Sequence, residues 1–149
     1  MDKRESDLDG KIVFALSENS RLSFRELAKK LGVSTSTIAQ HVKRLETQKV
    51  LRRYSVDLDW EKLGFDLTAL IEITIRGQPL LKVQAAIAKL PQVVSVWDIT
   101  GRFDSMALVR VKNRRELSTT VKKILDIEGV EHSDTHLILN TVKENYLTI

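Results

Sequence analysis

Four polar side chains between residues 36 and 47 have the types and the spacing needed to read the edges of DNA bases. At about 100° per residue of an α-helix, they fall on one side: Ser36, Gln40, Lys43 and Thr47, with Arg44 beside them. Gln pairs well with adenine, Arg and Lys pair with guanine, and hydroxyl groups bond either to bases or to phosphates. The pattern therefore favours contact with nucleic acid over catalysis.

The basic charge of the chain is concentrated around this segment. The net charge is +4 over 149 residues, yet residues 21–53 contain nine Lys and Arg against only Glu26 and Glu46. Residues 1–20 contain three Lys and Arg against five Asp and Glu. Such an asymmetry is expected of a protein that binds a polyanion, although a solvated basic face would explain the charge by itself.

Three helices are predicted to hold the polar side chains, within residues 7–48. Ser23 and Glu26 form a capping box, which starts the second helix, and Gly32 ends that helix. Ser34 or Thr35 caps the third helix, so only Gly32-Val33 separates the two. Two helices joined by so short a turn that contains glycine are typical of a helix-turn-helix.

The stretch KVLRRYSVDL follows the third helix and alternates apolar and polar residues. It favours a short two-stranded wing that brings two arginines to a phosphate backbone. We therefore predict a winged helix-turn-helix domain at residues 1–56 and a linker at 57–66. The DNA contacts are expected from Arg21, Ser23, Ser34, Thr35, Ser36, Thr37, Gln40, His41, Lys43, Arg44, Arg52 and Arg53.

The rest of the chain, residues 67–149, has the order β-α-β twice. We expect strands at 67–75, 93–100, 106–111 and 130–142, and helices at 80–90 and 114–125. This order describes a ferredoxin-like βαββαβ sandwich, with two helices on one face of an antiparallel sheet. The fold class is therefore α+β. In the first helix the buried candidates include Leu81, Ala85, Ile87 and Ala88.

The other face of this sheet has no helix to cover it. Strands such as ALIEITI and HLILNTV are apolar on more than one side, which indicates that both faces are buried. A core of this size also gains from a partner, so we expect a homodimer formed face to face. Trp60 and Trp97 are expected to anchor the linker and the core.

The loop Gly101-Arg102-Phe103-Asp104 lies between two predicted strands and contains opposite charges. A plain hairpin turn would use the glycine for its backbone freedom and Asp104 for local N–H groups. A ligand site would use Asp104 for an ammonium group, and Arg102 for a carboxylate. His132 and His136 stand about 13 Å apart on a strand, so a shared metal ion is not expected.

Several classes of function are disfavoured by what the sequence lacks. It has no cysteine, which excludes a disulfide framework and a thiolate nucleophile. No stretch approaches the roughly 18 apolar residues of a membrane span, and the first residues do not form a targeting signal. We expect a cytoplasmic protein that is not an enzyme, with no cofactor and no metal site.

The order and spacing of these motifs resemble the Lrp/AsnC family of transcription regulators, over about residues 8–143. The resemblance is carried by LDGKIVFALSENSRLSFRELAKKLGVSTSTIAQHVKRLE, by GRFD between two strands, and by the closing VEHSDTHLIL. It implies homodimers through the C-terminal sheets, which assemble into tetramers or octamers. It also implies an amino-acid effector bound between C-terminal domains, by Thr100, Gly101, Arg102, Phe103, Asp104, Ser133 and Thr135.

Two residues depart from the family pattern. His41 stands where an arginine is common, and Arg102 stands where an acidic residue is common. We interpret the sequence as that of a transcriptional regulator that binds double-stranded DNA and whose activity responds to an amino acid. An architectural DNA-binding protein without a ligand is one alternative, and a ferredoxin-like protein that binds small molecules without acting on DNA is another.

Overall fold

The computed structural model describes residues 3–144, which form two compact units. One unit extends to Asp57 and the other spans Leu58–Glu144. Each unit has a hydrophobic core of its own, and each is therefore described by itself.

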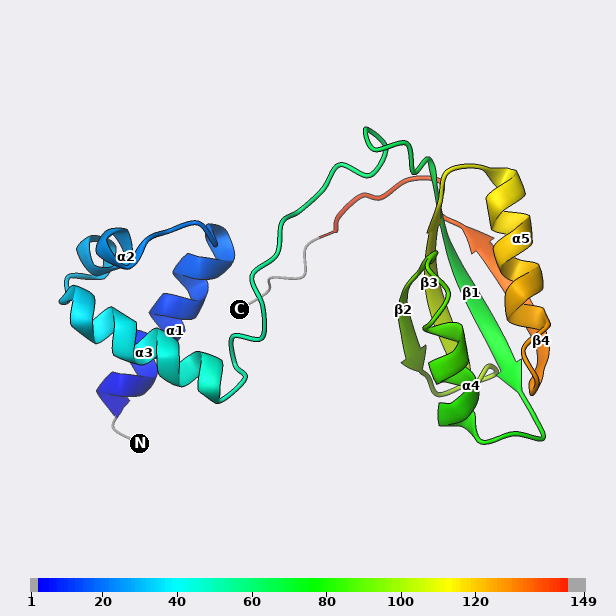
Figure 1. Cartoon of the computed structure of the whole chain (residues 1–149), viewed down its shortest axis with the longest axis horizontal. Coiled ribbons are helices and arrows are strands. Elements are labelled where there is room, and N and C mark those ends of the chain that lie inside the picture. The colour runs from blue at the N-terminus through cyan, green and yellow to red at the C-terminus, as the bar shows by residue number, and fades with distance from the viewer. Residues whose placement is uncertain (1–2, 145–149) are drawn as a thin grey trace. The chain divides into compact units, whose positions relative to one another are not determined.

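The first unit consists of three helices, α1 (Lys3–Glu18), α2 (Phe24–Leu31) and α3 (Thr35–Thr47) (Figure 1). Apolar side chains recur every three or four residues on each helix, so each turns one stripe inward. The buried core consists of Ile12, Ala15, Leu16, Leu27, Ala28, Ile38, Val42 and Leu45. Phe24 is 43% exposed, because it opens α2 ahead of the residues that reach the core.

The ends of α2 and α3 are fixed by the residues that the sequence indicated. Ser23 caps α2 in a capping box with Glu26, and Gly32 ends the helix in the left-handed conformation at φ 69°. Ser34 then caps α3, its hydroxyl accepting from the N–H of Thr37. The predicted helix-turn-helix is confirmed.

The structure has no strand in residues 48–66, where a two-stranded wing was expected. A strand pair needs a second run and a turn, and the segment supplies a single alternating run. Its apolar side chains remain outside: Val50, Tyr54, Val56 and Leu58 are all 40% exposed or more. The start of the segment is tied to α3 by backbone bonds from Val50 and Leu51 to the Leu45 carbonyl. Further along, the Tyr54 hydroxyl donates to Glu46 Oε1 at 3.0 Å.

The second unit is a four-stranded antiparallel sheet with two helices on one face (Figure 1). Its elements are β1 (Leu67–Ile75), α4 (Leu80–Ile87), β2 (Val93–Asp98), β3 (Ser105–Val111), α5 (Arg114–Leu125) and β4 (Val130–Leu137). The strand order β2-β3-β1-β4 places β1 and β3 in the middle. The expected α+β, ferredoxin-like fold is confirmed, with β2 and β4 ending earlier than predicted.

The core of this unit lies between the sheet and its helices. Ile71 and Ile73 of β1 are fully buried there, whereas the alternate residues Leu70 and Glu72 point to the other face. Trp97 was expected to anchor the core, but its side chain is 44% exposed. It pairs with Met106, which lies opposite Glu72, so Trp97 belongs to the face that the helices leave uncovered.

Of the four residues of α4 and its C-cap predicted to be buried, the structure buries Ile87 and leaves the other three exposed. Leu81 is 75% exposed and both Ala85 and Ala88 are exposed, whereas Val83 and Ile87 are buried. The stretch LLKVQAAIAKL is apolar on every side of a helix, so its periodicity does not select a face. Packing against the sheet selects it instead.

Candidate functional site

The polar face of α3 is exposed, and two of its long side chains have no partner. Ser36, Gln40, Lys43 and Thr47 are all exposed. Within residues 7–144, nothing hydrogen-bonds or pairs with the side chains of Gln40 and Lys43. Long polar side chains on a rigid, capped helix keep all their donors and acceptors for an external ligand, and a DNA groove offers complementary ones.

The hydroxyl groups at the helix starts are already used within the chain. Ser34 Oγ lies 2.8 Å from both Ser36 Oγ and Thr37 Oγ1. The Ser23 hydroxyl and its backbone N–H bond to Glu26 and lower the pKa of that carboxyl group. These hydroxyls can still accept from or donate to a phosphate, but the caps fix where they point. Their predicted DNA contacts stay predictions.

Two other predicted contacts, His41 and Arg44, turn toward α1. His41 Nδ1 lies 2.7 Å from Asp9 Oδ1, and Nη2 of Arg44 donates to Asp9 Oδ2 at 2.8 Å. The side chains of His41 and Asp9 are 12% and 13% exposed. No sequence pattern indicates Asp9 in this role, because it is 32 residues from His41 and only folding brings them together.

Arg52 and Arg53 are exposed beside the point where the segment is tied to α3. Burial of the Tyr54 hydroxyl, together with its bond to the Glu46 carboxylate, raises the pKa of Tyr54. The same bond occupies the one acidic side chain of α3.

The GRFD loop joins β2 to β3 in the second unit. Gly101 has a φ of 125°, which an L side chain rarely adopts. Phe103 is turned inward and is 8% exposed, and the Arg102 guanidinium lies 5.4 Å from the centre of its ring. The aromatic ring thus anchors the loop, and the cation lies over it as a cation–π contact.

Asp104 binds the neighbouring strand through both its backbone and its side chain. Its N–H donates to the Ile73 carbonyl at 3.1 Å, and its Oδ2 accepts from the Ile75 N–H at 2.8 Å. The β1–β4 register shifts between Thr74 and Ile75, so the carboxylate bonds a backbone group where the ladder is irregular. The bond reaches 29 residues along the chain and is not the local turn contact considered from the sequence.

The other predicted effector residues lie at the same end of the sheet. Ile73 pairs with Ser133 on one side and with Ser105, which follows Asp104, on the other. The loop and Ser133 are thus separated by two strand spacings, or roughly 10 Å. Thr100 and Thr135 are exposed, whereas the Ser133 hydroxyl is buried with no hydrogen-bond partner. A buried polar atom without a partner calls for an explanation, and a ligand would supply one.

The two histidines of β4 each pair with a carboxylate. His132 Nε2 lies 2.9 Å from Asp134 Oδ1, and His136 Nε2 lies 2.9 Å from Glu72 Oε2. Among the described residues, no group of three or more His, Asp or Glu is arranged to hold a metal ion. Nor does any described helix have the length and apolar character needed to cross a membrane.

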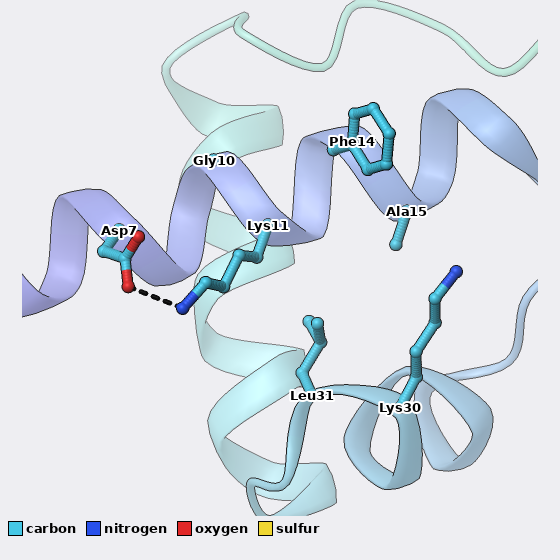
Figure 2. Close-up of a pocket in the computed structure, with 7 residues that line it drawn as sticks. All are labelled: Asp7, Gly10, Lys11, Phe14, Ala15, Lys30 and Leu31. Atoms are coloured by element: carbon cyan, nitrogen blue, oxygen red, sulfur yellow. Dashed lines mark hydrogen bonds and ion pairs between the residues drawn. The ribbon is translucent and has the colours of Figure 1, made fainter.

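A shallow hollow of about 340 Å³ lies between α1 and α2. Figure 2 shows Phe14 and Leu31 at its apolar part, and Lys11 bonded to Asp7 at its rim. None of the predicted site residues lines it. It is therefore distinct from the polar face of α3 and from the loop.

Two family descriptions match the two units. Residues 5–52 match a winged helix-turn-helix DNA-binding family, and residues 68–148 match the Lrp/AsnC ligand binding domain. An uncharacterised HTH-type transcriptional regulator of Pyrococcus furiosus is 41% identical over 140 residues, which are 94% of this chain and 95% of that protein.

Solved structures of other proteins resemble this chain in both units. A feast or famine regulatory protein from M. tuberculosis complexed with L-methionine aligns with a TM-score of 0.90 at 30% identity, covering 96% of this chain and 97% of that one. A transcriptional regulator from Neisseria meningitidis in complex with L-Met aligns with a TM-score of 0.88 at 28% identity, covering 98% and 94%. Both are similar to this chain along nearly its full length.

Proposed function

The chain belongs to the Lrp/AsnC family of transcription regulators, and we propose that it reads operator DNA with the polar face of α3 and binds an amino acid beside the GRFD loop. It combines a DNA-binding helix-turn-helix with a ligand-binding domain, as the family does. We further propose that it acts in the cytoplasm, where the DNA is, and that it performs no catalysis.

The unpartnered side chains of α3 carry the DNA-binding proposal. Gln40 and Lys43 project from a helix that is capped at its start and packed by its other side. We assign a base contact to Gln40, and phosphate contacts to Lys43 and to the residues around this face. The proposed set is Arg21, Ser23, Ser34, Thr35, Ser36, Thr37, Gln40, Lys43, Arg52 and Arg53.

The test compares two alanine variants on operator and random duplexes, after footprinting has located the operator. If Gln40 reads a base edge, Gln40→Ala weakens operator binding by roughly 1–3 kcal/mol and relaxes the preference at one base pair. If Lys43 neutralises a phosphate, Lys43→Ala weakens both duplexes and lowers the salt slope by about 0.9. Equal weakening of both duplexes by Gln40→Ala would show that Gln40 touches only the backbone.

The loop and the start of β4 support an amino-acid site. Arg102 supplies a cation for a ligand carboxylate, and Asp104 has a second carboxylate oxygen besides the one that binds Ile75. The buried Ser133 hydroxyl supplies a polar group that lacks a partner. Two structural neighbours were crystallised with L-methionine, which supports the same ligand class here.

Calorimetry of the full chain with each of the twenty amino acids tests this assignment. At least one should give heat and shift operator binding, and by linkage the operator should shift the affinity for that amino acid by the same factor. Arg102→Ala should weaken the binding if the guanidinium holds the carboxylate. Absence of heat with all twenty would leave the loop as a structural turn.

We also propose that the protein is a homodimer that assembles further, into tetramers or octamers. The uncovered face of the sheet exposes Trp97 and half-buries Leu70. The alternating run after α3 also leaves Val56 and Leu58 exposed. A second copy would cover such surfaces. Sedimentation that shows a monomer at micromolar concentration would contradict the proposal.

A further inference from the structure

An acidic side chain of α1 binds two side chains of the DNA-binding helix. Asp9 accepts from Arg44 at 2.8 Å through Oδ2, and its Oδ1 lies 2.7 Å from His41 Nδ1. Arg44 Nη2 and His41 Nδ1 are themselves 3.2 Å apart. The three groups thus form one cluster between α1 and α3, at the edge of the polar face of α3, where Arg44 follows Gln40 by one helical turn.

The cluster is withdrawn from water, which makes it stronger than a surface ion pair. The Asp9 side chain is 13% exposed and that of Arg44 is 31% exposed. Salt screens such partly buried pairs much less than it screens exposed ones. A hydrogen bond between two ionised groups is also about twice as strong as a neutral one. By contrast, the side chain of the preceding residue, Lys43, is exposed and has no hydrogen-bond or ion-pair partner among residues 7–144.

We propose that Asp9 is a positioning residue for DNA binding, which holds Arg44 and His41 against α1 and keeps the Arg44 cation from the DNA. The basic helix then meets DNA with one cation fewer than its sequence suggests. The contacts of Asp9 with His41 and Arg44 set the orientation of α3 relative to α1, while Gln40 and Lys43 remain exposed. His41 and Arg44 serve in this anchor and not in base or phosphate contacts.

The salt dependence of binding separates this role from a direct contact. Each phosphate that a protein cation neutralises contributes about 0.9 to the slope of log affinity against log salt. Between 50 and 200 mM salt, one such contact corresponds to an additional loss of affinity of about 3.5-fold. A change in stability alone would lower affinity without changing this slope.

The test measures fluorescence anisotropy of a random-sequence duplex with the full chain, between 50 and 200 mM salt. Arg44→Gln removes the cation but keeps an amide that can donate to Asp9, and Lys43→Gln is its matched neighbour. We expect Lys43→Gln to reduce the slope by about 0.9 and Arg44→Gln to leave it unchanged. A reduction of about 0.9 in both variants would overturn the proposal, since Arg44 would then already contact a phosphate.

A second pair of variants tests the release of the cation. Asp9→Asn keeps the shape of the side chain and removes its charge, so Arg44 is held less tightly against α1 and the slope should steepen, by up to about 0.9. The double variant Asp9→Asn/Arg44→Gln should return to the wild-type slope. A slope that Asp9→Asn leaves unchanged, in a protein with wild-type helical circular dichroism, would also overturn the proposal. If Asp9→Asn does not fold, the comparison of Arg44→Gln with Lys43→Gln still decides whether Arg44 contacts a phosphate.

Discussion

Replacing Asp104 distinguishes its role in the fold from its role toward a ligand. Its Oδ2 accepts from the Ile75 N–H at 2.8 Å, so Asp104→Ala leaves this partly buried donor without an acceptor. Asp104→Asn keeps an oxygen of nearly the same position and removes only the charge. The two variants should therefore differ in stability, although both lose the carboxylate that an ammonium group would need.

The expected loss of stability in each variant follows from the hydrogen bond that the variant loses or weakens. An unsatisfied buried donor costs about 1–3 kcal/mol, whereas an acceptor that is kept but no longer charged costs about 1 kcal/mol or less. For a domain the size of the Leu58–Glu144 unit, 1 kcal/mol corresponds to roughly 4–8 °C in melting temperature. Asp104→Ala should therefore melt at least about 4 °C below wild type, and Asp104→Asn should lie between the two.

Differential scanning calorimetry at one fixed protein concentration provides the measurement, because association makes the melting temperature depend on concentration. Calorimetric titrations of the same samples with the effector then measure whether each variant still binds it. If Asp104 binds an ammonium group, both variants lose effector heat regardless of their melting temperatures. Wild-type melting of Asp104→Ala would refute the reasoning, since the carboxylate would then not hold the end of β1.

Three further changes test other parts of the structure. Gly129→Ala should destabilise by more than Gly64→Ala in thermal melts, because both have positive φ but only at Gly129 would the new Cβ meet a side-chain carbon 2.7 Å away. Ile38→Ala, at a fully buried position, should lower the free energy of unfolding by about 2–5 kcal/mol in urea titrations. Glu26→Gln should lower the melting temperature at pH 7 but not at about pH 2. Hydrogen bonds from Ser23 lower the pKa of Glu26 in the folded protein. The ionised carboxylate therefore stabilises the fold above the ordinary carboxyl pKa, and this stabilisation disappears as the pH falls through the lowered pKa of the folded protein.

The sequence predicts best those features that neighbouring residues decide. Ser23, Gly32 and Ser34 fix the ends of α2 and α3 through bonds to backbone groups within a few positions, so their types reveal the helix-turn-helix directly. The order of strands and helices in the second unit was predictable for the same reason. The buried side of α4 was not, because its stretch is apolar all round and the sheet decides which residues it covers.

The contacts that organise the two candidate sites are set by tertiary structure. Asp9 reaches His41 over 32 residues, and Asp104 reaches Ile75 over 29. Sequence periodicity does not reveal such distant pairs, so it could indicate neither the Asp9 partner of His41 nor the Ile75 partner of Asp104. Residues 48–66 contain no paired strands, although residues 5–52 match a winged helix-turn-helix family, because an alternating run predicts an extended segment but does not supply the strand that would pair with it.

The two sites differ in how readily they can diverge during evolution. The side chains of Gln40 and Lys43 bond to nothing within residues 7–144, so under the proposed function substitutions there alter which DNA is bound and leave folding intact. Phe103 and Asp104 are buried or bonded to β1, so the same loop that would meet an effector also holds the sheet together. Duplicated copies of such a gene can therefore acquire new operators by single substitutions on α3. A new effector is expected to come from the outward residues, Arg102 and Thr135, around a loop frame that stays the same.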